Sequence, residues 1–122
     1  MSGPGERGQA TVEVALVLPV VVVMLLLVVQ AGLLVRDQVL AVHAARAGAR
    51  AVAVDPRADA AERAVGAMGL GGRARVEVAG DLVPGGIATV TVVVDPRRVP
   101  VVGRALGGLR LSERMAALVE EP

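Results

Sequence analysis

The sequence contains no cysteine, no lysine and no aromatic residue. Without cysteine the chain can form no disulfide, no thiolate nucleophile and no sulfur-ligated metal site. Without Phe, Tyr or Trp, a core must be built from Val, Leu, Ala and Met, which bury less area per residue than aromatic side chains do. The composition therefore predicts a small domain of marginal stability, supported by packing against a helix or against neighbouring subunits.

Neither sign of charge dominates. The basic residues are 13 arginines and the acidic residues number 12, which leaves a net charge of +1. A nucleic-acid-binding protein needs a basic patch, and proteins that read RNA or single strands also stack bases on aromatic side chains. We therefore expect no nucleic-acid partner.

Residues suited to catalysis are also scarce. The chain has one histidine, His43, and two serines, Ser2 and Ser112, and neither serine has a base nearby in the sequence. The carboxylates are scattered over expected solvent faces, and a lone histidine on a polar helix face is usually solvated. We predict a protein that is not an enzyme and has no cofactor, metal or small-molecule substrate.

The most prominent feature present is an apolar run of 22 residues, Val14 to Val35, whose single polar member is Gln30. A run of this length predicts a transmembrane helix, and it would span about 33 Å. Pro19 predicts a local kink. The rival interpretation is a cleaved secretory signal peptide, whose apolar region would be about 7–15 residues long and followed by a small-x-small cleavage site. This run is longer, and the sequence after it, Arg36–Val39, continues as a helix.

An acidic residue, Glu13, stands directly before the run, and Gly8 stands five positions before Glu13. On position alone, Glu13 would lie at headgroup level and stabilise the N-terminus of the helix. The stretch Gly8-Gln9-Ala10-Thr11-Val12-Glu13, followed by an apolar helix, resembles the processing site of type IV prepilins. The wider stretches Arg7–Pro19 and Arg46–Ala51 resemble TadE-like proteins, the minor pseudopilins of tight-adherence (Tad/Flp) pilus systems.

The resemblance implies that a prepilin peptidase cuts after Gly8 and that Gln9 becomes the mature N-terminus. It further implies that the Glu13 carboxylate pairs with the Gln9 ammonium of a neighbouring subunit during assembly, where a poorly solvated pair would specify register. The partners implied are the membrane, the prepilin peptidase and other Tad pilus or pseudopilin subunits. The alternative is an uncleaved bitopic envelope protein whose head binds another membrane complex.

The resemblance also implies a single-pass cell-membrane protein with its N-terminus in the cytoplasm and its head outside. The arginine distribution favours the opposite orientation, because only Arg7 precedes the run while Arg36, Arg46 and Arg50 follow it. We expect the orientation that the resemblance implies, because a dedicated peptidase reads the short leader.

Beyond the apolar run, residues 36–53 keep a helical period, so one helix of about 60 Å is expected from about Thr11 to Ala53. Its expected apolar face consists of Val39, Val42, Ala45, Ala49 and Val52. Its expected polar face consists of Arg36, His43, Arg46 and Arg50. The pairs Ala44/Gly48 and Ala45/Ala49 either permit close helix approach or simply reflect an alanine-rich composition.

The second half predicts a short helix and a small sheet. Asp55 is the expected N-cap of a helix from Pro56 to Met68. Alternation predicts strands at Arg73–Ala79 and Ile87–Val94, joined through a Pro84-Gly85 turn of type II. The apolar loop Asp95–Gly108 would cover the sheet or touch a partner or the membrane surface. The last element, up to Glu120, fits a strand or a helix, and the family resemblance favours a strand.

Together these features predict an α+β, pilin-like fold. A long N-terminal transmembrane helix continues as an amphipathic helix and is followed by a short helix and an antiparallel sheet of about three strands. The expected segments are a cytoplasmic leader at 1–8, an assembly helix at 9–53 with its membrane span at about 14–35, and an extracytoplasmic head at 54–122.

Overall fold

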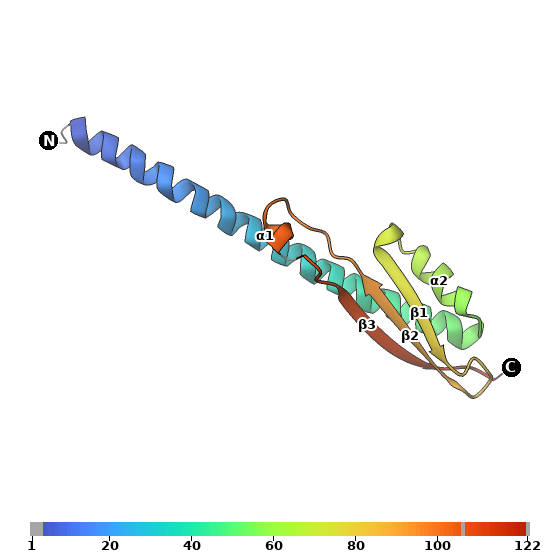
Figure 1. Ribbon diagram of the computed structural model, residues 1–122. Coiled ribbons are helices and arrows are strands. Elements are labelled where there is room, and N and C mark those ends of the chain that lie inside the picture. The colour runs from blue at the N-terminus through green and yellow to red at the C-terminus, as the bar shows by residue number, and fades with distance from the viewer. Residues whose placement is uncertain (1–3, 106, 122) are drawn as a thin grey trace.

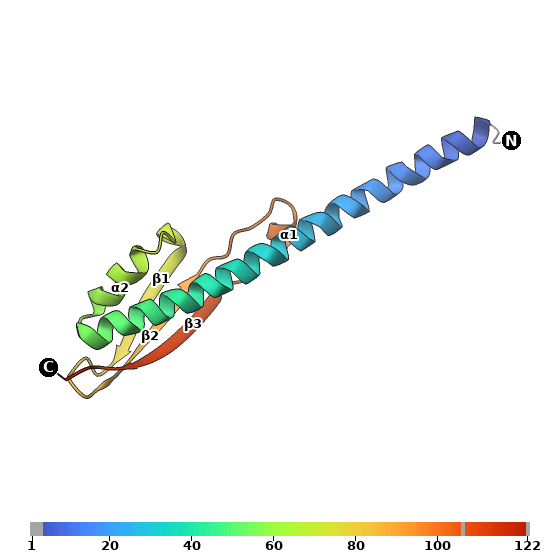
Figure 2. The same ribbon diagram turned by 180° about the vertical axis from the view of Figure 1, so that it is seen from behind.

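One long helix, α1 (Pro4–Val54), runs through the molecule, and the remaining elements pack beside its C-terminal half (Figures 1 and 2). The computed structural model describes residues 4–105 and 107–121. Residues 1–3 of the expected leader, Leu106 of the apolar loop and Pro122 of the expected head lie outside the described residues.

Helix α1 has 51 residues and is therefore about 77 Å long. It begins at Pro4, earlier than the expected start near Thr11, so the described part of the leader is helical. Proline suits a first helical position, and Glu6 in the first turn complements the helix dipole. Pro19 lies inside α1 without interrupting it, and α1 is a single rod in both views.

The other elements follow in the expected order. They are α2 (Ala58–Gly66), a 3-10 turn at Gly71–Arg73, β1 (Ala74–Gly80), β2 (Ile87–Val94), α3 (Val102–Ala105) and β3 (Leu111–Leu118). The three strands form one antiparallel sheet in the order β1-β2-β3. The predicted α+β class is confirmed.

The alternation that predicted the strands is present in the sheet, and the structure shows which face is buried. Val90, Val92 and Val94 of β2 are fully buried, while the residues between them are only partly buried. In the β1–β2 connection, the Gly86 N–H donates to the Val83 carbonyl at 2.8 Å and Gly85 has a φ of 79°. This is the hydrogen bond and the positive φ that a type II Pro-Gly turn requires.

The C-terminal element is a strand, so the helical alternative is wrong. Its register runs from Leu111 opposite Val94 to Leu118 opposite Ile87. Pairing with the second edge of β2 gives every residue of β3 a cross-strand partner, and it completes the minimum sheet that is stable in water. Past the strand, the Glu120 N–H donates to the Ala53 carbonyl at 2.8 Å and fastens the tail to the end of α1.

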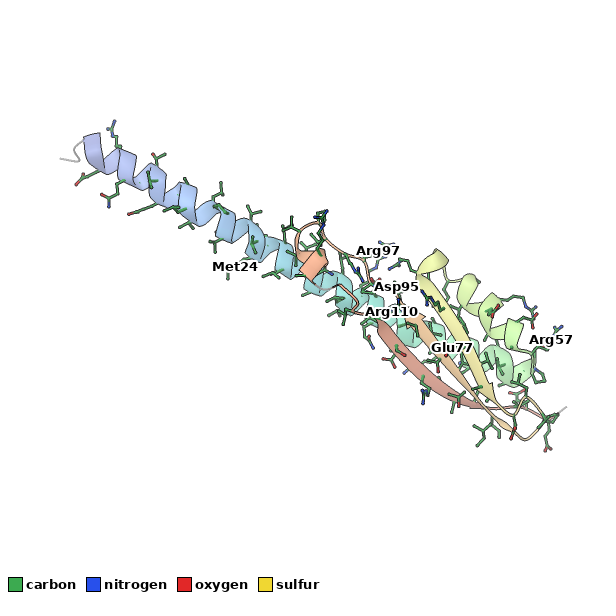
Figure 3. The ribbon with its side chains drawn as sticks, in the orientation of Figure 1. Met24, Arg57, Glu77, Asp95, Arg97 and Arg110 are labelled. Atoms are coloured by element: carbon green, nitrogen blue, oxygen red, sulfur yellow. The ribbon has the colours of Figure 1, made fainter. Side chains whose placement is uncertain are left out.

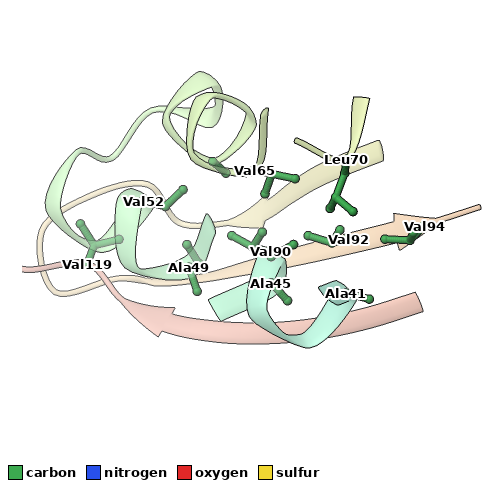
Figure 4. Packing of buried hydrophobic residues seen from close by; sticks show 13 residues of the cluster. Ala41, Ala45, Ala49, Val52, Val65, Leu70, Val90, Val92, Val94 and Val119 are labelled. Atoms are coloured by element: carbon green, nitrogen blue, oxygen red, sulfur yellow. The ribbon is translucent and has the colours of Figure 1, made fainter. Parts of the chain in front are cut away.

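The core lies between α1, α2 and one face of the sheet (Figure 4). The α1 residues facing it are small, and they are Ala41, Ala44, Ala45, Gly48, Ala49 and Val52. A Cβ placed on Gly48 would lie 3.0 Å from Val90 Cγ1. The small-x-x-x-small pairs therefore let β2 and α2 approach α1 within the chain.

The buried face of α1 is rotated relative to the expected one. Val39 is exposed, whereas Ala41 and Ala44 are buried. The expected polar face is confirmed, because Arg36, His43, Arg46 and Arg50 are all exposed. The rotation follows from size, because only alanine and glycine let the sheet come close.

Helix α2 is shorter than expected, and Asp55 is not its N-cap. The cap position belongs to Arg57, whose side chain makes no capping hydrogen bond. Asp55 instead accepts hydrogen bonds from Arg57 at 2.9 and 2.8 Å and from Arg63 at 3.3 Å. Ala60, Ala61 and Val65 of α2 are buried in the core, and the helix ends at Gly66, before Met68.

Candidate assembly surface

The N-terminal half of α1 makes no packing contact that buries its side chains. From Val12 to Val29 every residue is exposed except the half-buried Leu26. Within this stretch, which we call the free segment, Glu13 is the only charged residue. Among the described residues α1 is the one helix long and apolar enough to cross a membrane, and its most apolar window is not buried at all.

The three residues predicted as functional lie on this exposed part of α1. Gly8, Gln9 and Glu13 are all exposed, and a Cβ placed on Gly8 would meet nothing within 4 Å. Glu13 stands at one end of a shallow surface groove along α1, lined further by Val14, Val17, Leu18 and Val21. Among the described residues, no hydrogen bond or ion pair involves the Glu13 carboxylate. The structure thus presents a carboxylate beside an exposed apolar stripe.

The Gly8–Gln9 peptide bond lies within α1 and not in an extended segment. A helical peptide bond must be locally unwound before a peptidase can reach it. Two glycines, Gly5 and Gly8, occur in the first turns, and each weakens a helix by about 1 kcal/mol relative to alanine. The N-terminal end is therefore the part of α1 that unwinds most easily.

Sequence analysis missed a polar attachment at the C-terminal end of the expected membrane span. Gln30 is 2% exposed, and its side chain binds the β2–β3 loop twice. Its Nε2 donates to the Arg97 carbonyl at 2.9 Å, and its Oε1 accepts from the Val99 N–H at 2.7 Å. The loop therefore covers α1 at Gln30, inside the stretch 14–35 expected to lie in the membrane.

Asp37, two turns further along α1, continues this attachment. It is 1% exposed, and its Oδ2 accepts from the Arg97 N–H at 2.7 Å and from Arg73 Nη1 at 3.2 Å. Gln38 beside it donates to Glu113 of β3. The seven-residue spacing of Gln30 and Asp37 indicates that they share a helix face, but no local signal identifies partners 60 or more residues away.

The described residues were also compared with the donor sets that metal ions require. In the part of the chain that the structure describes, no group of three or more His, Asp or Glu side chains could hold a metal ion. What the fold defines is one exposed apolar helix, a candidate membrane span, with a small α+β head fastened along its second half (Figure 1).

Residues 8–50 match the family model of TadE-like proteins, which confirms the resemblance that the N-terminal motif predicted. The matched stretch lies wholly inside α1 and contains both the free segment and most of the packed half. No curated protein and no solved structure matches the chain. The matched family is associated with the Tad pilus and is generally non-enzymatic, and the match concerns α1 and not the head.

Proposed function

We propose that the protein is a pseudopilin that takes part in assembling a Tad-type pilus. Before assembly the free segment would hold the subunit in the cell membrane, with the N-terminus cytoplasmic and the head outside. During assembly the same segment would leave the lipid and pack against the helices of other pilus subunits. The head, fastened to the other half of α1, would determine which subunits are accepted.

The observation that carries this proposal is the free segment itself. It is a continuous stretch of exposed Val, Leu and Met side chains, and the TadE-like match covers it completely. Such a surface needs either lipid or other helices around it. An assembly subunit needs both environments in turn, and the free segment fits both.

Glu13 gives the proposed assembly its register. Hydrolysis of the Gly8–Gln9 bond would add water across the peptide, leaving a carboxylate on Gly8 and an amine on Gln9. The Gln9 ammonium of one subunit would then pair with the Glu13 carboxylate of its neighbour. Leaving either charge unpaired in an apolar bundle is costly, so only one axial register would satisfy both.

The processing step can be tested with two matched glycine variants. Intact mass of the membrane-extracted protein, from cells with an active prepilin peptidase, should show loss of residues 1–8. Gly8→Ala should block this loss, whereas Gly5→Ala should not, although both positions are open and both substitutions favour helix equally. Full-length mass for the unmodified chain would favour the uncleaved envelope protein and contradict the pseudopilin proposal.

The register step needs a separate measurement. Glu13→Gln keeps the shape of the side chain but removes its charge, so membrane insertion and cleavage should persist while incorporation into pili falls. Glu6→Gln is the control, because Glu6 lies in the same exposed end of α1 but would be removed with the leader. Equal incorporation of both variants would exclude the Glu13–Gln9 pair.

The proposed orientation can be read from a single cysteine, because the chain has none of its own. Ala116 is exposed on β3 in the head, so Ala116→Cys is accessible to reagents. A membrane-impermeant maleimide should label it in intact spheroplasts. Labelling only after lysis would place the head in the cytoplasm, as the arginine distribution favours.

A further inference from the structure

A part of the β2–β3 loop, residues 97–104, carries three arginines that the fold leaves exposed. They are Arg97, Arg98 and Arg104, and no ion pair between described residues involves them. The neighbouring arginines differ, because Arg73 binds Asp37 at 3.2 Å and Arg110 binds Asp95 at 3.5 Å. Three guanidinium groups thus point outward from one short segment.

The same segment holds an apolar side chain outward on a strained backbone. Val101 has a φ of 69° and is 71% exposed. A β-branched residue rarely adopts this conformation, and such strain persists only where the surroundings enforce it. Here the Gly103 N–H donates to the Val99 carbonyl at 2.7 Å, and a Cβ on Gly103 would lie 2.5 Å from Arg98 Cβ. The tight turn therefore fixes Val101 at its tip.

The position of the segment explains what it could face. The hydrogen bonds of Gln30 hold the 97–99 backbone against α1 one residue past Val29, where the free segment ends. Figure 3 shows Arg97 beside α1, on the side of the head that faces the free half of the helix. If the free segment spans a bilayer, the 97–104 segment lies at the headgroup layer.

We propose that residues 97–104 rest on the membrane surface and bind the phosphates of anionic lipid headgroups. Arginine guanidinium groups suit phosphate geometry, and each one near an anionic surface strengthens attraction about fivefold. Val101 would enter the boundary between headgroups and acyl chains, as apolar residues of interfacial segments do. The proposal requires only that the free segment is inserted, so it holds for either orientation and whether or not the leader is cut.

The contact would set the depth of the protein in the bilayer. With the membrane surface at Gln30, the inserted part is Val12–Val29, which spans about 27 Å as a helix. That length is close to the hydrocarbon thickness of about 30 Å. The membrane span would therefore end about six residues earlier than the apolar run of the sequence indicates.

Depth-sensitive spin labelling of the full chain in nanodiscs tests the proposal. Nitroxides would be attached at Val101→Cys and, as a control, at Ala116→Cys on the exposed side of β3. Nanodiscs would contain either phosphatidylcholine alone or phosphatidylcholine mixed with phosphatidylglycerol. The label at 101 should be reached by oxygen better than by a water-soluble nickel complex, and more so in the anionic nanodiscs. The label at 116 should show aqueous accessibility in both.

Charge variants distinguish binding of lipid phosphates by the arginines from mere closeness of residues 97–104 to the bilayer. Replacing Arg97, Arg98 and Arg104 together by Gln should remove the response of the label at 101 to anionic lipid, with about a hundredfold loss of anionic-lipid preference. Replacing three other exposed arginines, Arg46, Arg75 and Arg114, by Gln changes net charge equally and should leave that response intact.

Three outcomes would overturn the proposal. One is a label at 101 as water-accessible as the label at 116 in anionic nanodiscs, a measurement that needs no arginine substitution. Another is shielding of the label at 101 from the nickel complex that depends on the number of protein copies per nanodisc and not on the lipid composition. A second copy of the protein would then cover the segment. The last is an equal loss of the lipid response in both triple variants.

Discussion

The two halves of α1 differ in the size and direction of their apolar side chains. The free segment carries Val, Leu and Met, and nearly all are exposed. The packed half, from Gln30 to Val54, turns alanine and glycine toward the sheet, and its buried polar residues are Gln30 and Asp37. Large outward side chains suit lipid and then neighbouring helices, whereas small inward ones allow the chain's own strands to approach.

This difference means that one continuous helix serves two kinds of packing. The head depends on contacts within the chain, so changes in the packed half should alter its stability. In the proposed function the free segment depends on surroundings outside the chain, so changes there should alter insertion or assembly and leave the head intact. Each prediction below tests whether that separation holds.

The largest effect is expected at Asp37. Asp37→Ala removes a buried carboxylate that binds Arg73 and the Arg97 N–H, and it should destabilise the head by about 3–5 kcal/mol. Asp37→Asn should cost less, because both hydrogen bonds go to Oδ2 and an amide oxygen in its place can still accept them, although the charge is lost. Hydrogen exchange of the β2 amides in micelles measures the loss.

Two controls for Asp37 come from α2 and from the free segment. Asp59 forms only exposed ion pairs, so Asp59→Ala should change stability by less than about 1 kcal/mol. Val22→Ala, in the free segment, should leave β2 exchange unchanged. Faster β2 exchange in the Val22 variant would mean that the free segment supports the head and that the two halves are not separate.

The next effect concerns close approach at Gly48. Gly48→Val would force Val90 and Val65 away, and overpacking of this kind costs about 1–3 kcal/mol. Gly32→Val is the matched control, because Gly32 lies on the same helix with nothing within 4 Å of a Cβ. Thermal unfolding of the two variants in micelles gives the comparison, and equal stability would show that the core yields to the added side chain.

How far the sequence predicts the fold depends on how local each signal is. The alternation of Val90, Val92 and Val94 has a period of two, so it predicts the strand and places these residues on one face. Pro84-Gly85 predicts its turn because the required φ values are local properties. The C-terminal strand was ambiguous because Leu111, Met115 and Leu118 also have helical spacing, and only pairing with β2 decides the outcome.

The attachment of the loop to α1 was not predictable in this way. Gln30 and Asp37 find partners in residues 97–99, and Asp37 also binds Arg73. No periodicity or turn chemistry connects segments so distant in the chain. Gly8, Gln9 and Glu13 were recognisable by motif, and the structure shows them exposed. Their proposed roles involve a peptidase and other subunits, so the single chain cannot show them.

A smaller effect of opposite sign is expected at Val101. Asparagine tolerates a positive φ much better than valine, so Val101→Asn should relieve strain and stabilise the head by about 1 kcal/mol. A rise in the unfolding temperature in micelles would confirm the strain. If Val101 also contacts the membrane, the same variant should bind anionic nanodiscs less well. The strained backbone at Val101 would then lower the stability of the head in exchange for contact with the membrane surface.

The smallest effect lies at the exposed corner between α1 and α2. The hydrogen bond and charge of Arg57, with a contribution from Arg63, hold the pKa of the Asp55 carboxyl below its ordinary value. A carboxyl whose pKa is lowered by folding adds stability above its unfolded pKa, about 3.9, and loses it as pH falls through the folded pKa. The wild type should therefore unfold at a higher temperature than Asp55→Asn at pH 7, and this difference in unfolding temperature should disappear below about pH 4.

The difference in unfolding temperature should also shrink in an Arg57→Gln background. If the difference in unfolding temperature between the wild type and Asp55→Asn stays constant with pH, Asp55 acts through its shape alone. The contact between α1 and α2 at Asp55 would then resemble the neutral packing of α1 against β2 and not the charged attachment at Asp37.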